Sequence, residues 1–106
     1  MATIINLTPH EVKLVTSEGV KKYTPSGKIA RVSMTRELIR MVDGVFAYRP
    51  IPGEVVDLPS PQEGVYYIVS ALVRTALPER KDLLSPADFV RDEDGTILGC
   101  KSFDCN

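Results

Sequence analysis

The chain has 106 residues, of which 43% are hydrophobic and 25% are charged, and its formal net charge is −1. This length predicts one globular domain over residues 1–106 with one modest core. No apolar run approaches the roughly 18 residues of a membrane span, and the near-neutral charge is untypical of a protein that binds duplex nucleic acid. The first residues lack the basic start and apolar segment of a signal peptide, so we expect a cytoplasmic protein.

Short strands separated by turns fill the N-terminal part of the chain. Residues 3–7 and 12–16 combine β-branched and apolar residues in the pattern of half-buried strands. A glycine-containing turn leads to residues 20–24, which return along the second strand and predict a hairpin. After a further break, residues 28–33 alternate again and predict another strand.

Residues 34–50 admit two interpretations. A helix over residues 34–42 fits the spacing of four apolar residues, which are Met34, Leu38, Met41 and Val42. Asp43 and Gly44 between two valines instead favour the type I′ turn of a β-hairpin. We favour the hairpin.

The most informative stretch is in the second half of the chain. Residues 53–58 predict a strand, and a proline-containing loop then leads to residues 65–69, VYYIV, which read as a buried strand. Good helix formers follow at residues 70–77 and predict a short α-helix, which Pro78 ends because its ring disfavours the helical conformation of the preceding residue.

A second Asp-Gly signal closes the chain. Residues 89–91 and 96–100 flank the polar tip at residues 92–95, which predicts a terminal hairpin. The total is eight or nine short strands. The predicted fold is mainly β, a small barrel or sandwich of short antiparallel strands with one short α-helix near residues 70–77.

The chain offers few residues for catalysis or metal binding. His10 is the only histidine, and no G-x-S-x-G, Walker or G-x-G-x-x-G motif occurs. A hydrolase is therefore disfavoured, and we expect a protein without enzymatic activity or cofactor. One histidine and two cysteines do not make up a zinc site, so we expect no metal. Cys100 is expected to be a small core residue and Cys105 to lie in a frayed tail.

A candidate anion site lies where the strand of residues 65–69 meets the helix. The first amides of a helix are unpaired, and Arg74 lies one turn after Ser70 on the same face. Arg80 and Asp82 follow in the next loop, and either arginine would hold a phosphate. Arg74 equally fits a pair with a surface carboxylate, and Arg80 with Asp82 equally fits an ion pair that fixes the loop.

A second group of polar residues lies at the end of the first predicted strand. Asn6, Thr8 and His10 occupy alternate positions and, with Ser70, would orient the same ligand. These residues equally fit local turn caps and structural hydrogen bonds. Tyr66 and Tyr67 must face opposite sides of their strand, so one belongs to the core and the other is free to stack on a base or cover a partner.

Several short motifs, taken in order, are similar to a family of small proteins encoded by bacteriophages and prophages. They are residues 6–12 (NLTPHEV), 25–27, 30–32, 58–70 (LPSPQEGVYYIVS), 78–86 (PERKDLLSP), 90–92 and 95–100. Residues 34–49 match least. The resemblance implies an accessory protein that acts in the host bacterial cytoplasm. Small phage proteins of this kind are often inhibitors of host defence, and some sequester nucleotide signals.

Two functions are therefore expected. The first is a binding protein that sequesters a small, anionic, nucleotide-like signalling molecule without turnover. The alternative is a protein-interaction module that docks on a host enzyme and inhibits it. Residues 1–53 hold eight Lys and Arg against four Asp and Glu, and residues 54–106 hold five against ten. This asymmetry fits a charged partner, or two halves of one core that neutralise each other, which we favour. Exposed strand edges predict a homo-oligomer.

Overall fold

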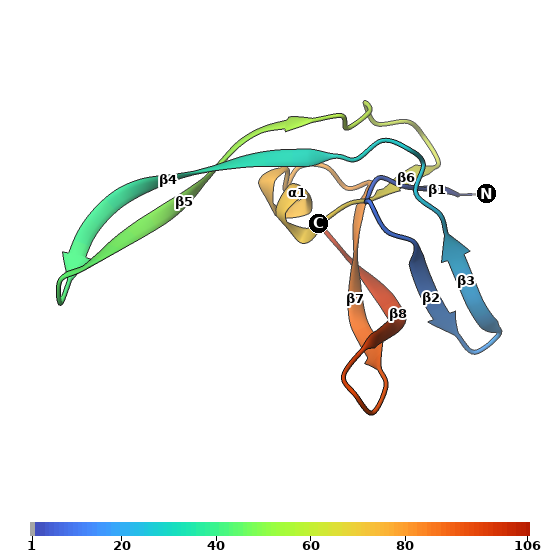
Figure 1. Cartoon of the computed structure of the whole chain (residues 1–106). Helices are drawn as coiled ribbons and strands as arrows, with labels where there is room; N and C mark the ends of the chain where they lie inside the picture. Colours follow the sequence, from blue (N-terminus) through green and yellow to red (C-terminus); the bar gives the residue numbers. More distant parts are fainter. Residues whose placement is uncertain (1) are drawn as a thin grey trace.

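The structure is a computed structural model that describes residues 2–106, which form eight strands and one helix (Figure 1). The strands are β1 (Thr3–Asn6), β2 (Val12–Thr16), β3 (Gly19–Tyr23), β4 (Arg31–Val42), β5 (Val45–Val56), β6 (Val65–Ile68), β7 (Leu83–Arg91) and β8 (Ile97–Cys105). The helix is α1 (Ala71–Ala76). The prediction of a mainly β fold with one short helix near residues 70–77 is confirmed.

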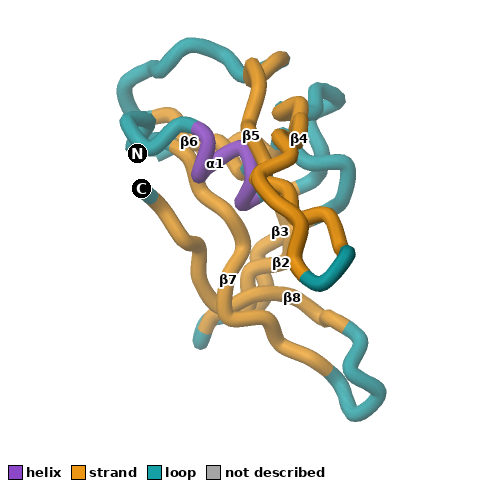
Figure 2. The backbone as a smooth tube through the Cα atoms, turned by 90° about the vertical axis from the view of Figure 1, so that its left-hand side faces the viewer, coloured by secondary structure: helices purple, strands orange, loops and turns teal. Residues whose placement is uncertain are grey.

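Six of the strands form one sheet in the order β1-β6-β7-β8-β2-β3, and this sheet curls into a half-barrel (Figure 2). Three of its pairings are parallel, namely β1 with β6, β6 with β7, and β2 with β8. The prediction of antiparallel strands throughout is therefore corrected. Parallel partners must be joined by long connections, so each lies far from its neighbour in the sequence, where residue patterns carry no pairing information.

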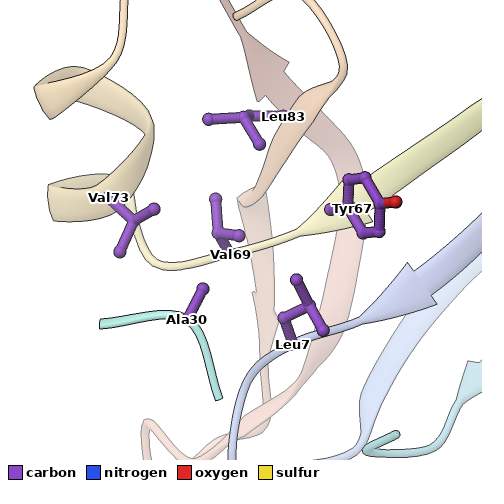
Figure 3. Packing of buried hydrophobic residues seen from close by; sticks show 6 residues of the cluster. All are labelled: Leu7, Ala30, Tyr67, Val69, Val73 and Leu83. Carbon is purple, nitrogen blue, oxygen red and sulfur yellow. The ribbon is translucent and has the colours of Figure 1, made fainter. Parts of the chain in front are cut away.

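The main core lies between this sheet and α1 (Figure 3). Its buried side chains converge from the sheet, the helix and the loops, and they are Leu7, Ala30, Tyr67, Val69, Val73 and Leu83. Tyr67 is 2% exposed and Tyr66 is 38% exposed, so the expectation that only one of them is core is confirmed.

A second, smaller core cluster lies on the other side of the sheet. It joins Val12, Ile68 and Cys100, which confirms Cys100 as a core residue. Its burial raises the pKa of the Cys100 thiol. Cys105 is exposed and unbonded, but it pairs with β7 as the last residue of β8, so the prediction of a frayed tail is wrong.

β4 and β5 form a separate two-stranded sheet, which we call the arm (residues 31–56). They are joined at Asp43 and Gly44, whose φ angles of 48° and 78° are those of a type I′ turn. The predicted hairpin is confirmed, and the helical alternative for residues 34–42 is wrong. The strand predicted at residues 28–33 begins only at Arg31. Of the strand predicted at residues 53–58, residues 53–56 form the end of β5 and the last two residues lie outside any strand.

The arm projects away from the rest of the molecule, which we call the body (Figure 1). The Cα radius of gyration is 16.5 Å, whereas a compact chain of this length has about 13 Å. The longest dimension reaches 53 Å. The arm is therefore an extension that the body leaves largely uncovered.

The predicted terminal hairpin is also confirmed, with longer strands than expected. β7 and β8 pair in antiparallel fashion on both sides of the turn at residues 92–95. The Asp92 carboxylate accepts hydrogen bonds from the amides of Asp94 (2.9 Å) and Thr96 (3.0 Å), which fixes the turn.

Candidate functional site

Asn6 is buried at the end of β1, and its side chain makes four hydrogen bonds. Its amide nitrogen donates to the carbonyl of His10 at 2.8 Å and to that of Tyr23 at 2.9 Å. Its side-chain oxygen accepts from the amide of Thr8 at 2.9 Å and from the Thr8 hydroxyl at 2.6 Å. β1 and β3 are the two ends of the sheet order, so Asn6 ties the edges of the curled sheet together.

These bonds match the structural alternative for the first polar group. All polar atoms of the Asn6 side chain have partners inside the protein, and the Thr8 hydroxyl also lies 3.0 Å from the carbonyl oxygen of His10. His10 takes part through its backbone carbonyl, and the residue is exposed. The ligand-binding role of these three residues stays a prediction, although the Thr8 side of the cluster borders an apolar groove of about 310 Å³ that Ser70 also lines.

The junction between β6 and α1 is capped by its own side chains. Ser70 is the N-cap, and its hydroxyl accepts a hydrogen bond from the amide of Val73 at 3.3 Å. The Arg74 guanidinium donates to the buried Ser85 hydroxyl at 2.8 Å and to the Asn106 side-chain oxygen at 3.2 Å. The structure therefore places Ser70 and Arg74 together, but it directs Arg74 toward β7 and the end of β8.

Asn106 closes the other end of the helix, a role that no sequence signal indicated. Its amide nitrogen lies 2.9 Å from the carbonyls of Arg74 and Leu77 and 3.1 Å from that of Arg80. The carbonyls of Arg74 and Leu77 also accept backbone hydrogen bonds from the amides of Leu77 and Arg80, so Asn106 reinforces a turn that the backbone already closes. Finding this cap from the sequence would have required knowing that residues 106 and 74 meet in space.

Arg80 and Asp82 form a bidentate ion pair with both N–O distances at 2.8 Å. The guanidinium also donates to the carbonyl of Pro59 at 3.0 Å, and the two side chains are only 15% and 14% exposed. The hydrogen bond from Arg80 holds the pKa of Asp82 below its ordinary value, and the same bond raises the pKa of Arg80. This geometry matches the predicted loop-fixing pair.

An open groove of about 380 Å³ runs beside this ion pair. Its walls come from the loop before β6 and the loop after α1, and they include Gln62, Tyr66, Glu79 and Lys81. Tyr66 is the tyrosine that the core leaves free, so its ring offers a flat apolar surface there. Arg80 and Asp82 border the groove as an already neutralised pair.

The feature that sequence reasoning missed is the arrangement of side chains on the arm. Strand register places paired residues on one face, and the pairs Leu38–Tyr48 and Met41–Phe46 share a face because of the bulge between Leu38 and Arg40. The Phe46 and Tyr48 rings lie 6.4 Å apart between centroids, which confirms that they are neighbours.

One face of the arm is therefore apolar. We call it the apolar face, and its large side chains are Met34 (42% exposed), Leu38 (51%), Met41 (58%), Phe46 (55%) and Tyr48 (42%). The Arg36 guanidinium lies 4.2 Å above the Tyr48 ring on the same face. The apolar face is continuous with the side of the arm on which Val32 and Val55, at the base of the arm, pack against the main core.

The opposite face of the arm is mixed in character. It carries the ion pair between Arg49 and Glu37, whose N–O distance is 2.9 Å, together with Thr35 and Arg40, but also the exposed apolar residues Val42, Val45 and Ile51. Both members of the ion pair are well exposed, at 65% and 52%. The two faces therefore differ in that both aromatic residues and both methionines of the arm lie on the apolar face, which has the character of a surface that another molecule covers.

Other kinds of site find little support in residues 2–106. No group of three or more His, Cys, Asp or Glu side chains there could hold a metal ion. No helix in the described part of the chain is long and apolar enough to cross a membrane. Comparison of the chain with family models, with curated proteins and with solved structures finds no match.

Proposed function

We propose that this chain is a non-catalytic interaction module that binds another polypeptide through the apolar face of its arm. One observation carries the proposal: five large apolar side chains, each 42–58% exposed, lie together on one face of a projecting ribbon. Contiguous apolar surfaces of this kind mark interaction sites in soluble proteins.

The physical state of the arm supports the same function. A two-stranded ribbon is marginally stable in water by itself, because each strand lacks a second neighbour and half of each side chain's surroundings is solvent. β4 and β5 are 12 residues each, about twice the usual length of a strand. A partner that covers the apolar face would supply the missing layer.

The residue types on this face suit protein recognition. Aromatic residues and arginine dominate the energetics of protein interfaces, and here Phe46, Tyr48 and Arg36 lie side by side. Binding would proceed by burial of these side chains, without turnover. The resemblance to phage-encoded proteins supports a bacterial setting for the partner.

Hydrogen exchange of the arm amides tests this function directly. We expect slow exchange in β4 and β5 at working concentration or in bacterial lysate, and fast exchange in Leu38→Ser/Phe46→Ser. The matched control is Val42→Ser/Val45→Ser, which removes two similarly exposed apolar residues from the opposite face. Arm amides that exchange freely in the wild type under all these conditions would refute the proposal.

The groove beside Tyr66 supports a second candidate function, the sequestration of a small nucleotide-like anion that counters host defence in the bacterial cytoplasm. Tyr66 would stack on a base, and Lys81 would supply a positive charge. Calorimetry with cyclic dinucleotides and ADP-ribose derivatives tests this candidate. Binding that is lost in Tyr66→Ala and Lys81→Ala would support it, and heat signals that are absent for every compound would reject it.

A further inference from the structure

Resting on the proposed function, we infer that the polypeptide on the arm is a second copy of this chain. The apolar face of one copy lies on the outer end of the β7–β8 hairpin of another copy. The argument uses the position of the two surfaces, the match of their side chains and charges, and the area that they cover.

One copy cannot make this contact with itself. Figure 1 shows the turn of the arm well separated from the turn between β7 and β8, because the two hairpins leave the body in different directions. An arm that covers a β7–β8 end therefore covers that of another copy.

The outer end of the β7–β8 hairpin offers an apolar receiving surface. Phe89 and Ile97 are each 49% exposed. They line a hollow of about 100 Å³ together with Pro86, the core residue Cys100 and two residues of opposite charge, Glu11 and Lys13. Interface side chains that contribute most to affinity insert into small, dry hollows of this kind.

The charges of the two surfaces are complementary. The turn next to the hollow carries Asp92, Glu93 and Asp94 in succession. On the apolar face of the arm, Arg36 forms no ion pair with any carboxylate within the described residues. Arg36 on one copy would meet the acidic turn of the other, which favours this orientation over packing of one arm on another arm, where Arg36 would meet Arg36.

The area is sufficient for a stable assembly. A large side chain offers about 150–250 Å² when fully exposed, so five half-exposed ones on an arm offer on the order of 500 Å². The half-exposed Phe89 and Ile97 of the receiving surface offer roughly 200 Å², so two reciprocal contacts would bury roughly 1,400 Å², which is in the range of stable interfaces. A second copy is present whenever the chain is made, so it is always available to stabilise a two-stranded ribbon that is only marginally stable alone.

Two broken variants and their mixture test the inference. The arm variant is Leu38→Ser/Phe46→Ser, and the hairpin variant is Phe89→Ser/Ile97→Ser. We expect light scattering to give a multiple of the 11.7 kDa chain mass for the wild type and for Val42→Ser/Val45→Ser, and the single-chain mass for either broken variant. Mixing the broken variants, one of them isotope-labelled, should give a mixed pair in native mass spectrometry, because one intact arm then meets one intact hairpin.

Each other outcome overturns a defined part of the inference. If the hairpin variant assembles like the wild type while the arm variant does not, the arms pack on each other and the β7–β8 surface is wrong. A wild type with the mass of one chain at high concentration rejects the second copy altogether. In that case, slow hydrogen exchange of the arm amides in bacterial lysate would still support the proposed function, with a different protein as the partner. Retained circular dichroism and a cooperative thermal transition identify variants that remain folded.

Charge exchange gives an independent readout. Arg36→Glu should weaken assembly at least about tenfold at low salt, whereas Arg40→Glu on the opposite face should not. Glu93→Lys/Asp94→Lys, added to Arg36→Glu in the same chain, should restore assembly, since the charges are then reversed on both surfaces and Asp92 still fixes the turn. Failure of the second pair to restore assembly would contradict the proposed orientation.

Discussion

Asn6 shows how a polar residue near a strand end can hold a sheet closed. Its side-chain amide joins β1 to the carbonyl of Tyr23 at the end of β3, so it connects the two outer strands of the six-stranded sheet. The backbone continues this connection, because the amide of Ser26 donates to the carbonyl of Asn6 at 3.0 Å. A buried amide with every polar atom bonded stabilises the closed edge and leaves none free for a ligand.

Replacement of Asn6 by Ala should therefore destabilise the protein. We expect a loss of about 1–3 kcal/mol in the free energy of unfolding, because two backbone carbonyls and the Thr8 amide lose their partner. The control is His10→Ala, which should stay within about 0.5 kcal/mol since only its backbone carbonyl takes part. Urea unfolding measures both, and equal effects of the two variants would show that Asn6 is not a structural residue.

The Arg80–Asp82 pair predicts a pH dependence with a defined sign. The pKa of Asp82 is lower in the folded than in the unfolded state, mainly because of the hydrogen bond from Arg80. Its contribution is therefore fully present above the unfolded pKa near 4, and it is lost as the pH falls through the lower folded pKa. Asp82→Asn should cost about 1–3 kcal/mol at neutral pH, and the difference from wild type should shrink in acid.

Urea unfolding over a pH series checks this prediction. Glu37→Gln is the matched control, because its ion pair with Arg49 is exposed and should contribute about 0–1 kcal/mol at any pH. A cost of Asp82→Asn that stays constant well below pH 4 would contradict the assigned cause.

At the scale of elements, β2 and β8 approach each other unusually closely at Gly99. A Cβ atom there would lie 2.8 Å from the carbonyl oxygen of Lys13 and 3.2 Å from a methyl group of Val15. Both of these atoms belong to β2, so the absence of a side chain is what allows this parallel pairing. The contact joins the β2–β3 hairpin to the rest of the sheet.

Gly99→Ala should accordingly separate β8 from β2. We expect a cost of about 1–3 kcal/mol, typical of overpacking, together with faster hydrogen exchange of the β2 amides. Lys101→Ala, an exposed position in the same strand, should change neither quantity appreciably. If the β2 amides of Gly99→Ala exchange as slowly as those of the wild type, the two strands accommodate a methyl group at this position and the close contact does not limit their pairing.

The helix α1 is an element that its surroundings create. Six residues are too few for a stable helix in water, because the free-energy cost of nucleation exceeds the stabilisation that one or two helical turns provide. Ser70 caps its start, Asn106 caps its end, and Val73 anchors it in the main core. Local composition favours a helix here, but the tertiary contacts make it persist.

At the scale of the whole molecule, the arm packs against the body only at its base. Val32 and Val55 pack against the main core, whereas the apolar face farther out does not. The body should therefore fold without the outer arm, and assembly should require it.

Replacing residues 35–50 by a short glycine-containing turn tests this division. We expect a cooperative unfolding transition, circular dichroism of a β protein and a Cys100 thiol that reacts only on unfolding, together with the loss of self-association. Thermal unfolding, thiol labelling and light scattering measure these three properties. A shortened chain that cannot fold would show that the outer arm, or its partner, is part of the folding unit.

The sequence by itself determined the features that depend on neighbouring residues. Alternation predicted the β2–β3 hairpin, Asp-Gly turns predicted the ends of the arm and of the β7–β8 hairpin, and residues 70–77 predicted a helix, because turn geometry and periodicity are local properties. The polar residues Asn6, Thr8, His10, Ser70, Arg74, Arg80 and Asp82 were recognised as a distinctive set from their residue types and spacing.

Only the tertiary structure decided what those residues do and which surface remains free. The parallel pairing of β1 with β6 and the cap that Asn106 gives to α1 join segments more than 25 residues apart, and no local pattern encodes such contacts. The bulge between Leu38 and Arg40 brings Met41 onto the face of Leu38, where it pairs with Phe46 beside Tyr48. A register shift of one residue exchanges the faces of a strand, so the apolar face exists only in the three-dimensional pairing of β4 with β5.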